Sequence, residues 1–171
     1  MSPVSPVGNE TPATVSILTE FYSDKLASLL QHKAHARFVE QYDANNTYQY
    51  VINREEVQLA WLAKAIMDAG ADVPDNAPAE RTPSRGGKDA AHAIFEDDAR
   101  SAQAFMDRWR PRVEALDHAR HQAMLRVILG ETREQQRFFE QALAGRTDLL
   151  GRRGEAAGPA KGEVLPARWI E

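Results

Sequence analysis

The chain has 171 residues, no cysteine and a formal net charge of -4 at pH 7, and its isoelectric point lies near 5.8. This length suits one domain with a self-sufficient core, and the lack of cysteine excludes disulfides, thiolate metal sites and a cysteine nucleophile. The sequence shows no basic stretch, signal-peptide pattern or membrane-spanning apolar run, so we expect a cytoplasmic protein that binds no nucleic acid and no membrane.

Residues 1–13 are rich in proline and serine and show no periodicity, which predicts a flexible N-terminal arm. The first helix is predicted over residues 14–41, where residues that form one buried face recur every three or four positions. These residues are Leu18, Tyr22, Lys25, Leu29, His32 and Ala36. A lysine therefore lies in the middle of the predicted inward face.

The second helix is predicted over residues 47–69, after a turn-rich segment at 42–46 and before Gly70. Because the connection is short, the first two helices should be antiparallel neighbours. The inward face of the second helix carries Ile52, Glu55, Leu59, Leu62 and Ile66. Burial of an unpaired carboxylate is costly, so Glu55 requires a positively charged partner, a proton or a metal ion.

Residues 70–88 are rich in Pro, Gly and Ala, and this segment is long enough to return the chain to the end at which the second helix began. A third helix parallel to the second is therefore predicted from residue 89, ending or kinking at Pro111. Its inward face carries Ile94, Asp98, Ala102, Phe105 and Trp109.

A fourth helix is predicted to start after a capping Asp117 and to run to residue 144. Its inward residues are Leu125, Ile128, Thr132, Gln135, Phe139 and Leu143. The C-terminal tail, residues 145–171, ends in apolar residues that are costly to leave in water. We expect this tail to dock on the bundle or on a partner.

Two antiparallel helix pairs joined by a long crossover loop form the ferritin-like arrangement of an all-α four-helix bundle. Three segments of this chain, YSDKLA at 22–27, REEVQLAWLAKAI at 54–66 and ILGETREQQRFFEQAL at 128–143, resemble segments of ferritin-like, rubrerythrin-type proteins. The resemblance covers residues 14–144 and leaves out both tails. It implies a ferritin-like bundle built around a di-iron site.

In the ferritin-like di-iron proteins, one helix of each pair supplies a Glu and the other supplies a Glu-x-x-His motif. This sequence departs from that pattern and has a degenerate di-iron motif. The matching positions are Lys25 in the first helix, Glu55 and Gln58 in the second, Asp98 in the third (Ser101 if the register is shifted by one turn), and Thr132 and Gln135 in the fourth. Both imidazoles and half of the carboxylates of the motif are therefore missing.

A standard di-iron site assembles about four carboxylates and two imidazoles, so two iron ions would be poorly neutralised here. We therefore predict a metal-free interior without a cofactor, in which Lys25 lies between Glu55 and Asp98. Gln58, Thr132 and Gln135 would complete a hydrogen-bonded network. The alternative is a reduced iron site, with ligands drawn from Glu55, Asp98, Glu131 and Glu134.

Two histidine pairs, His32 with His35 and His118 with His121, have the i, i+3 spacing that can place two imidazoles on one metal ion. No acidic residue lies between positions 28 and 39, so we expect a packed His32 and a half-exposed His35 rather than a metal site. At the second pair we expect Asp117 to cap the helix and both histidines to be exposed.

No nucleophile with its base and no glycine-rich phosphate loop is found, which makes an enzyme less expected. The leading hypothesis is a binding or structural protein that pairs with a protein partner or with itself as a homodimer. One alternative is a metal-dependent oxidase, peroxidase or iron-handling protein. A third hypothesis is that the polar interior binds a small molecule in a pocket between the helices.

Overall fold

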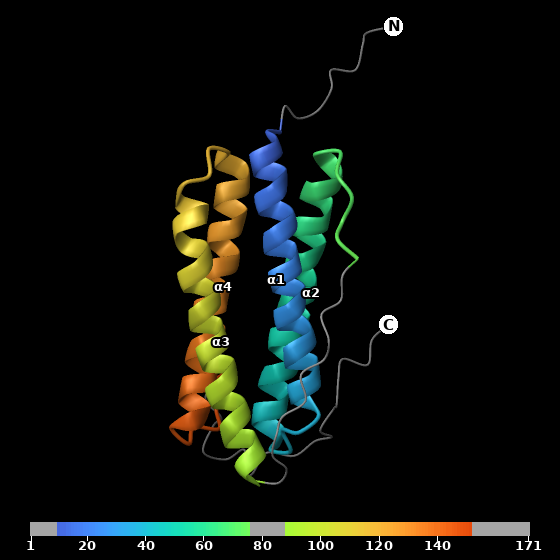
Figure 1. Ribbon diagram of the computed structural model, residues 1–171. Coiled ribbons are helices and arrows are strands. Elements are labelled where there is room, and N and C mark those ends of the chain that lie inside the picture. Colours follow the sequence, from blue (N-terminus) through green and yellow to red (C-terminus); the bar gives the residue numbers. More distant parts are fainter. Residues whose placement is uncertain (1–9, 76–87, 152–171) are drawn as a thin grey trace, which may run out of the picture.

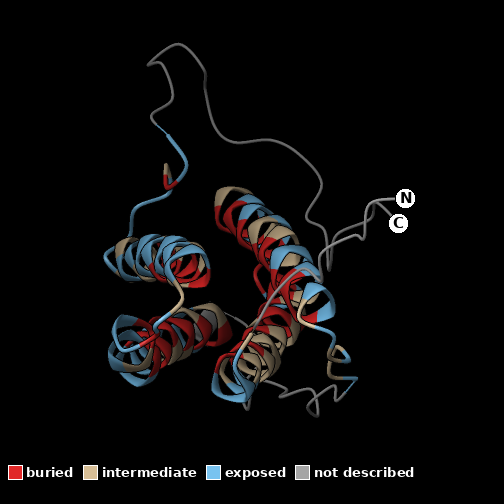
Figure 2. Ribbon diagram, turned by 90° about the horizontal axis from the view of Figure 1, so that it is seen from above, coloured by how far each residue is buried: buried red, intermediate tan, exposed pale blue. Residues whose placement is uncertain are grey.

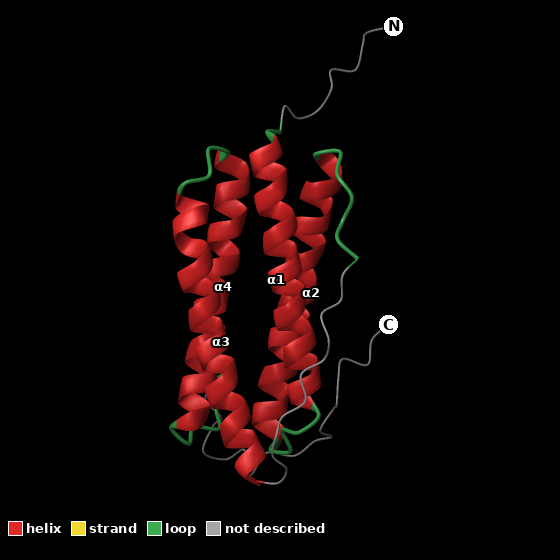
Figure 3. Ribbon diagram, in the orientation of Figure 1, coloured by secondary structure: helices red, strands yellow, loops and turns green. Residues whose placement is uncertain are grey.

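In the computed structural model the chain forms a four-helix bundle (Figures 1 and 3), of which residues 10–75 and 88–151 are described. The helices are α1 (Pro12–Ala36), α2 (Tyr42–Asp68), α3 (Lys88–Glu114) and α4 (Ala119–Leu143). Within the described ranges every regular element is a helix. The all-α class predicted from the hydrophobic periodicity is confirmed.

The four helices form two pairs, α1 with α2 and α3 with α4, and across the bundle α1 meets α3 while α2 meets α4. In Figure 1, α1 and α4 run downwards, whereas α2 and α3 both begin at the lower end and run upwards. The helices of each pair are thus antiparallel, and α3 is parallel to α2, as the length of the connection predicts. Residues 76–87 of that connection lie outside the described part of the chain.

The buried residues lie on the helix sides that face one another, as Figure 2 shows along the bundle axis. An aromatic cluster fixes α1 against α3: the Phe21 ring lies 5.2 Å from Phe105 and 4.8 Å from Trp109, in edge-to-face arrangements. The Trp109 indole N–H also donates a hydrogen bond to Asp24 Oδ2 at 2.8 Å. These contacts set the register of the two helices that carry most of the ionisable core residues.

The connection between α1 and α2 lies earlier in the chain than the sequence predicts, at residues 37–41 rather than 42–46, because α1 ends at Ala36 and α2 already begins at Tyr42. The predicted helix limits at residues 41 and 47 are therefore wrong. The turn-forming side chains act at the helix ends instead: Gln41 Oε1 accepts a hydrogen bond from the Ala44 N–H at 2.6 Å, and Asn45 Nδ2 donates to the Ala36 carbonyl at 3.1 Å. Such residues suit helix N-termini as well as turns.

Two other predicted limits also differ. Of the two outcomes predicted at Pro111, an end or a kink, the end is wrong: α3 continues through Pro111 to Glu114, and Trp109 and Val113 continue its buried stripe. The N-cap of α4 is His118 rather than Asp117, and its Nδ1 atom accepts a hydrogen bond from the His121 N–H at 3.2 Å. A histidine can thus do the capping that the sequence assigned to the preceding carboxylate.

Most of the predicted N-terminal arm and C-terminal tail, residues 1–9 and 152–171, lies outside the described residues. Before α1, residues 10 and 11 are described, and Thr11 caps the helix by accepting a hydrogen bond from the Thr14 N–H. After α4, Leu149 is buried against the core. Among the described helices, none is both long and apolar enough to cross a membrane.

Candidate functional site

The interior of the bundle holds a group of polar and ionisable side chains from all four helices, which we call the core cluster. It consists of Lys25, His32 and His35 of α1, Tyr48, Glu55 and Gln58 of α2, Asp98 of α3, and Thr132 and Gln135 of α4. Each of these residues is at most 5 % exposed. Buried charges are tolerated only when they are paired, so the contacts within the cluster decide its chemistry.

Glu55 has a positively charged or ionisable partner on each oxygen. Its Oε1 atom lies 2.9 Å from Lys25 Nζ, and its Oε2 atom lies 2.8 Å from His32 Nδ1. Burial alone would raise the pKa of Glu55, but the charges of His32 and Lys25, together with their hydrogen bonds, lower it on balance. Glu55 is therefore a carboxylate in the folded protein at neutral pH.

Asp98 is surrounded by hydrogen-bond donors. Its oxygens lie 2.9 and 2.8 Å from His35 Nδ1, Oδ1 accepts from Gln31 Nε2 at 2.7 Å, and Oδ2 accepts a short hydrogen bond from the Tyr48 hydroxyl. Burial raises the pKa of Asp98, but the charge of His32 and the contacts with His35 and Tyr48 lower it below its ordinary value. The pKa of Tyr48 is raised well above its ordinary value by burial and by Asp98, so its hydroxyl remains a donor.

His32 lies between the two carboxylates, with Nδ1 2.8 Å from Glu55 Oε2 and Nε2 3.8 Å from Asp98 Oδ1. Burial lowers the pKa of His32, yet the charges of Glu55 and Asp98 outweigh this effect and raise the pKa above its ordinary value. The sequence interpretation gave this bridging position to Lys25. Lys25 lies two helical turns from His32, about 10 Å along α1, so its ammonium reaches Glu55 but not Asp98.

With His32 protonated, the state that its raised pKa favours, the positive charges of Lys25 and His32 balance the negative charges of Glu55 and Asp98. The four groups form a continuous chain in which each carboxylate has its own partner and His32 serves both. Hydrogen bonds to charged groups in such an interior are strong because little water screens them. The arrangement therefore satisfies its own charge without an added cation.

The three uncharged residues of the predicted site lie beside this chain of charges. Thr132 Oγ1 is 3.5 Å from Lys25 Nζ and donates to the Ile128 carbonyl at 2.9 Å. Gln58 donates from Nε2 to Glu131, while its buried Oε1 has no hydrogen-bond partner among the described residues. The Gln135 amide also has no hydrogen-bond partner in the described part of the chain.

A cavity of about 190 Å³ opens beside Lys25. Its lining includes Lys25, His32, Glu55, Phe105, Thr132 and Gln135. The ammonium of Lys25 lies 5.3 Å from the centre of the Phe105 ring, so a cation and an aromatic face border the same space. The cavity thus combines donors, an unpartnered amide and an apolar wall.

The residues of the alternative iron set do not converge. Glu134 is exposed, and Glu131 forms an ion pair with Arg54 at 2.6 Å on the flank of the bundle. On α3, Asp98 is fully buried and Ser101 is half-buried, which decides the register in favour of Asp98. Among the described residues, two other groups of three place possible ligand atoms within 4.8 Å of one another: His35 with Asp97 and Asp98, and Glu10 with His118 and His121.

Both histidine pairs differ from their sequence interpretation. His35 is buried rather than half-exposed because Asp98, far away in the sequence, accepts a hydrogen bond from its Nδ1 atom. His121 is buried as well, against Glu10. In each pair the missing signal was a carboxylate on another segment, which sequence spacing alone cannot locate.

Comparison of the chain with protein-family models, with curated proteins and with solved structures finds no match. The features that are established are therefore those of the structure itself: a four-helix bundle with buried clusters of histidine and carboxylate side chains.

Proposed function

We propose that the chain is a ferritin-like bundle in which a charge-balanced polar core stands in place of a di-iron centre. In this proposal it is a binding protein for a small polar molecule rather than an iron oxidase. The observation that carries the proposal is the ion pair between Lys25 and Glu55, 2.9 Å long and almost fully buried, at the position where the family pattern requires two carboxylates.

The residues present do not fit two iron ions. A metal ion at Glu55 would lie next to the Lys25 ammonium, which repels it, and the two amides Gln58 and Gln135 occupy the positions of the imidazole ligands. Asp98, the remaining carboxylate, already accepts hydrogen bonds on both oxygens. We therefore assign no reaction step to iron in this protein.

Binding of a small molecule is supported by the cavity beside Lys25. Its volume, about 190 Å³, compares with a cavity of about 150 Å³ that holds one benzene ring in another protein. Gln135 offers an amide donor and acceptor without a partner among the described residues, Lys25 offers an ammonium, and Phe105 offers an apolar wall. This lining suits a ligand of about six non-hydrogen atoms that carries a carbonyl or carboxylate group.

The metal-free core is tested by elemental analysis of protein produced with added iron and then desalted. We expect no stoichiometric iron in the wild-type chain. Iron that is retained by the wild type and lost in Glu55→Gln would contradict the proposal, since that variant removes the central carboxylate of the core.

Ligand binding is tested by titrating acetate, lactate and propionamide into the full chain and following chemical shifts of the Lys25 and Gln135 side chains by NMR. We expect saturable shifts for at least one probe, and their loss in Gln135→Leu, which keeps the volume but removes the amide. Thr19→Val, a change on the outer side of α1, is the matched control and should leave binding unchanged. If all three probes leave both side chains unshifted, the cavity holds water alone and the binding proposal fails.

A further inference from the structure

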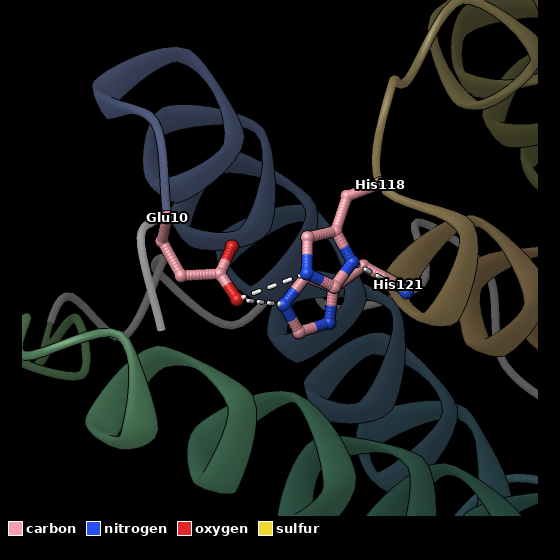
Figure 4. A group of neighbouring side chains, drawn as sticks. All are labelled: Glu10, His118 and His121. Carbon is pink, nitrogen blue, oxygen red and sulfur yellow. Dashed lines mark hydrogen bonds and ion pairs between the residues drawn. The ribbon is translucent and has the colours of Figure 1, made fainter. Parts of the chain in front are cut away.

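A second group of histidine and carboxylate side chains lies at the end of the bundle where α1 and α4 begin (Figure 4). We call Glu10, His118 and His121 the terminal cluster. Glu10 Oε1 lies 2.7 Å from His121 Nε2 and 3.3 Å from His118 Nε2. The two imidazole rings stack with their centres 4.0 Å apart, so both present a nitrogen to the same carboxylate.

The local sequence explains this convergence. His118 is the N-cap of α4 and His121 follows three residues later, so both side chains lie on one side of the first turn. Glu10 precedes Thr11, the N-cap of α1, and α1 begins at the same end of the bundle as α4. Two helix starts therefore bring together three residues that are far apart in the sequence.

Glu10 is only partly satisfied by these contacts. Its side chain is 11 % exposed, and its Oε2 atom is buried without a hydrogen-bond partner among the described residues. A buried carboxylate oxygen without a donor is unfavourable. A cation bound between Glu10 and the two imidazoles would remove this deficit.

In the other possible ligand group, His35 with Asp97 and Asp98, the buried carboxylate of Asp98 has no oxygen without a hydrogen-bond donor. Both oxygens of Asp98 already accept hydrogen bonds, from Gln31 and His35 on one oxygen and from His35 and Tyr48 on the other. A metal ion there would have to displace several donors at once. The terminal cluster is therefore the better candidate.

We propose that the terminal cluster binds a divalent transition-metal ion with the ligand preference of zinc. The ligands are Nε2 of His118, Nε2 of His121 and the carboxylate of Glu10, a set of two imidazoles and one carboxylate that suits Zn²⁺. A groove of about 620 Å³, which all three residues line together with Trp61 and Met124, gives access for a water molecule as the fourth ligand. An open fourth position is typical of zinc sites with exchangeable ligands.

Binding changes the first turn of α4. His118 Nδ1 accepts a hydrogen bond from the His121 N–H at 3.2 Å, which places the proton of the neutral ring on Nε2. Coordination through Nε2 requires this proton to move to Nδ1, so the capping hydrogen bond opens when the metal binds. Metal binding at this site is therefore coupled to the start of α4.

The test is calorimetric titration of Zn²⁺ into the full-length chain after removal of metals with a chelator, with Co²⁺ as a spectroscopic probe. We expect one site per chain and visible Co²⁺ absorption of four-coordinate intensity. Loss of even a supporting residue weakens metal binding about 10- to 100-fold, so Glu10→Gln and His121→Gln should each weaken it roughly 100-fold or more. His118→Asn should do the same while retaining a side-chain oxygen that caps α4.

Two matched controls locate the site. His92→Gln removes an exposed histidine of α3, and Asp97→Asn changes the other possible ligand group, so both should leave the zinc affinity unchanged. Helix content by circular dichroism identifies variants that fail to fold. The proposal is overturned if the folded wild type binds no zinc, if Asp97→Asn abolishes binding, or if His118→Asn binds zinc as tightly as the wild type.

Discussion

The core cluster and the terminal cluster both place histidines beside carboxylates, but the carboxylates of the two clusters have different partners. In the core, Glu55 is paired with Lys25, a fixed cation, and His32 is shared with Asp98. At the end of the bundle, the partners of Glu10 among the described residues are two histidines, and one of its oxygens is left without a donor. Lys25 thus makes the core network neutral without a metal ion, whereas the terminal cluster has histidines as partners and leaves room for a metal ion.

The largest effect is expected when this lysine is removed. Lys25→Met leaves Glu55 with His32 as its one ionisable partner in a buried site, and should lower the free energy of unfolding by about 3 to 5 kcal/mol, measured by urea denaturation. Lys33→Met is the control on the same helix, since Lys33 pairs with Glu56 at 2.9 Å but is 31 % exposed, and should cost less than about 1 kcal/mol. Equal losses in the two variants would remove the distinction between buried and exposed pairs.

A smaller loss is expected at the other end of the core network. Tyr48→Phe removes the hydroxyl that donates to Asp98 but keeps the ring against Phe139, at 5.4 Å between centres. A hydrogen bond to a charged group contributes about 1.5 to 3 kcal/mol, and Asp98 retains His35 and Gln31 as donors, so we expect the lower figure. The measurement is again urea denaturation. Tyr22→Phe on α1 is the control, because it removes a hydroxyl that does not contact Asp98. A Tyr48→Phe protein as stable as the wild type would show that Asp98 does not depend on this donor.

The sequence predicted the bundle well because helix spacing and the long connection are local properties. Lys25, Glu55 and Asp98 were assigned to inward faces from periodicity alone, and the structure places them there. Their pairing could not be read in the same way, because it depends on the rotation and height of helices relative to one another. His32 rather than Lys25 bridges the carboxylates for that reason, and Glu10 was placed in a flexible arm although it meets His121 across the bundle end.

The core network also predicts a pH window of stability. Glu55 and Asp98 have lowered pKa values in the folded state, so the stability they contribute is present above their ordinary values of 4.5 and 3.8 and is lost as pH falls further. His32 has a raised pKa, so its contribution is complete below its ordinary value of 6.5 and is lost as pH rises through the folded-state value.

Stability from this network is therefore greatest between about pH 4.5 and pH 6.5, with a loss above that range of at most about 1.4 kcal/mol per pH unit for one proton. The measurement is the unfolding free energy from pH 3 to pH 9. His32→Gln should remove the decline on the alkaline side and leave the acid side in place. A wild-type curve that stays flat above pH 6.5 would show that folding does not raise the pKa of His32.

The smallest effect is expected at the terminal cluster in the absence of metal ions. Glu10→Gln keeps a side-chain oxygen that can accept a hydrogen bond from His118 or His121. With a chelator present, the change should lower the unfolding free energy by less than about 1 kcal/mol, whereas Glu55→Gln strands Lys25 and should cost several times more. The comparison depends on which of the two variants loses more unfolding free energy. A carboxylate that the fold needs for its own charge balance cannot be replaced by a neutral amide without a large loss of stability. If Glu10→Gln proves as costly as Glu55→Gln under these conditions, the terminal carboxylate is a structural ion-pair partner, and its oxygens are already committed before any metal ion arrives.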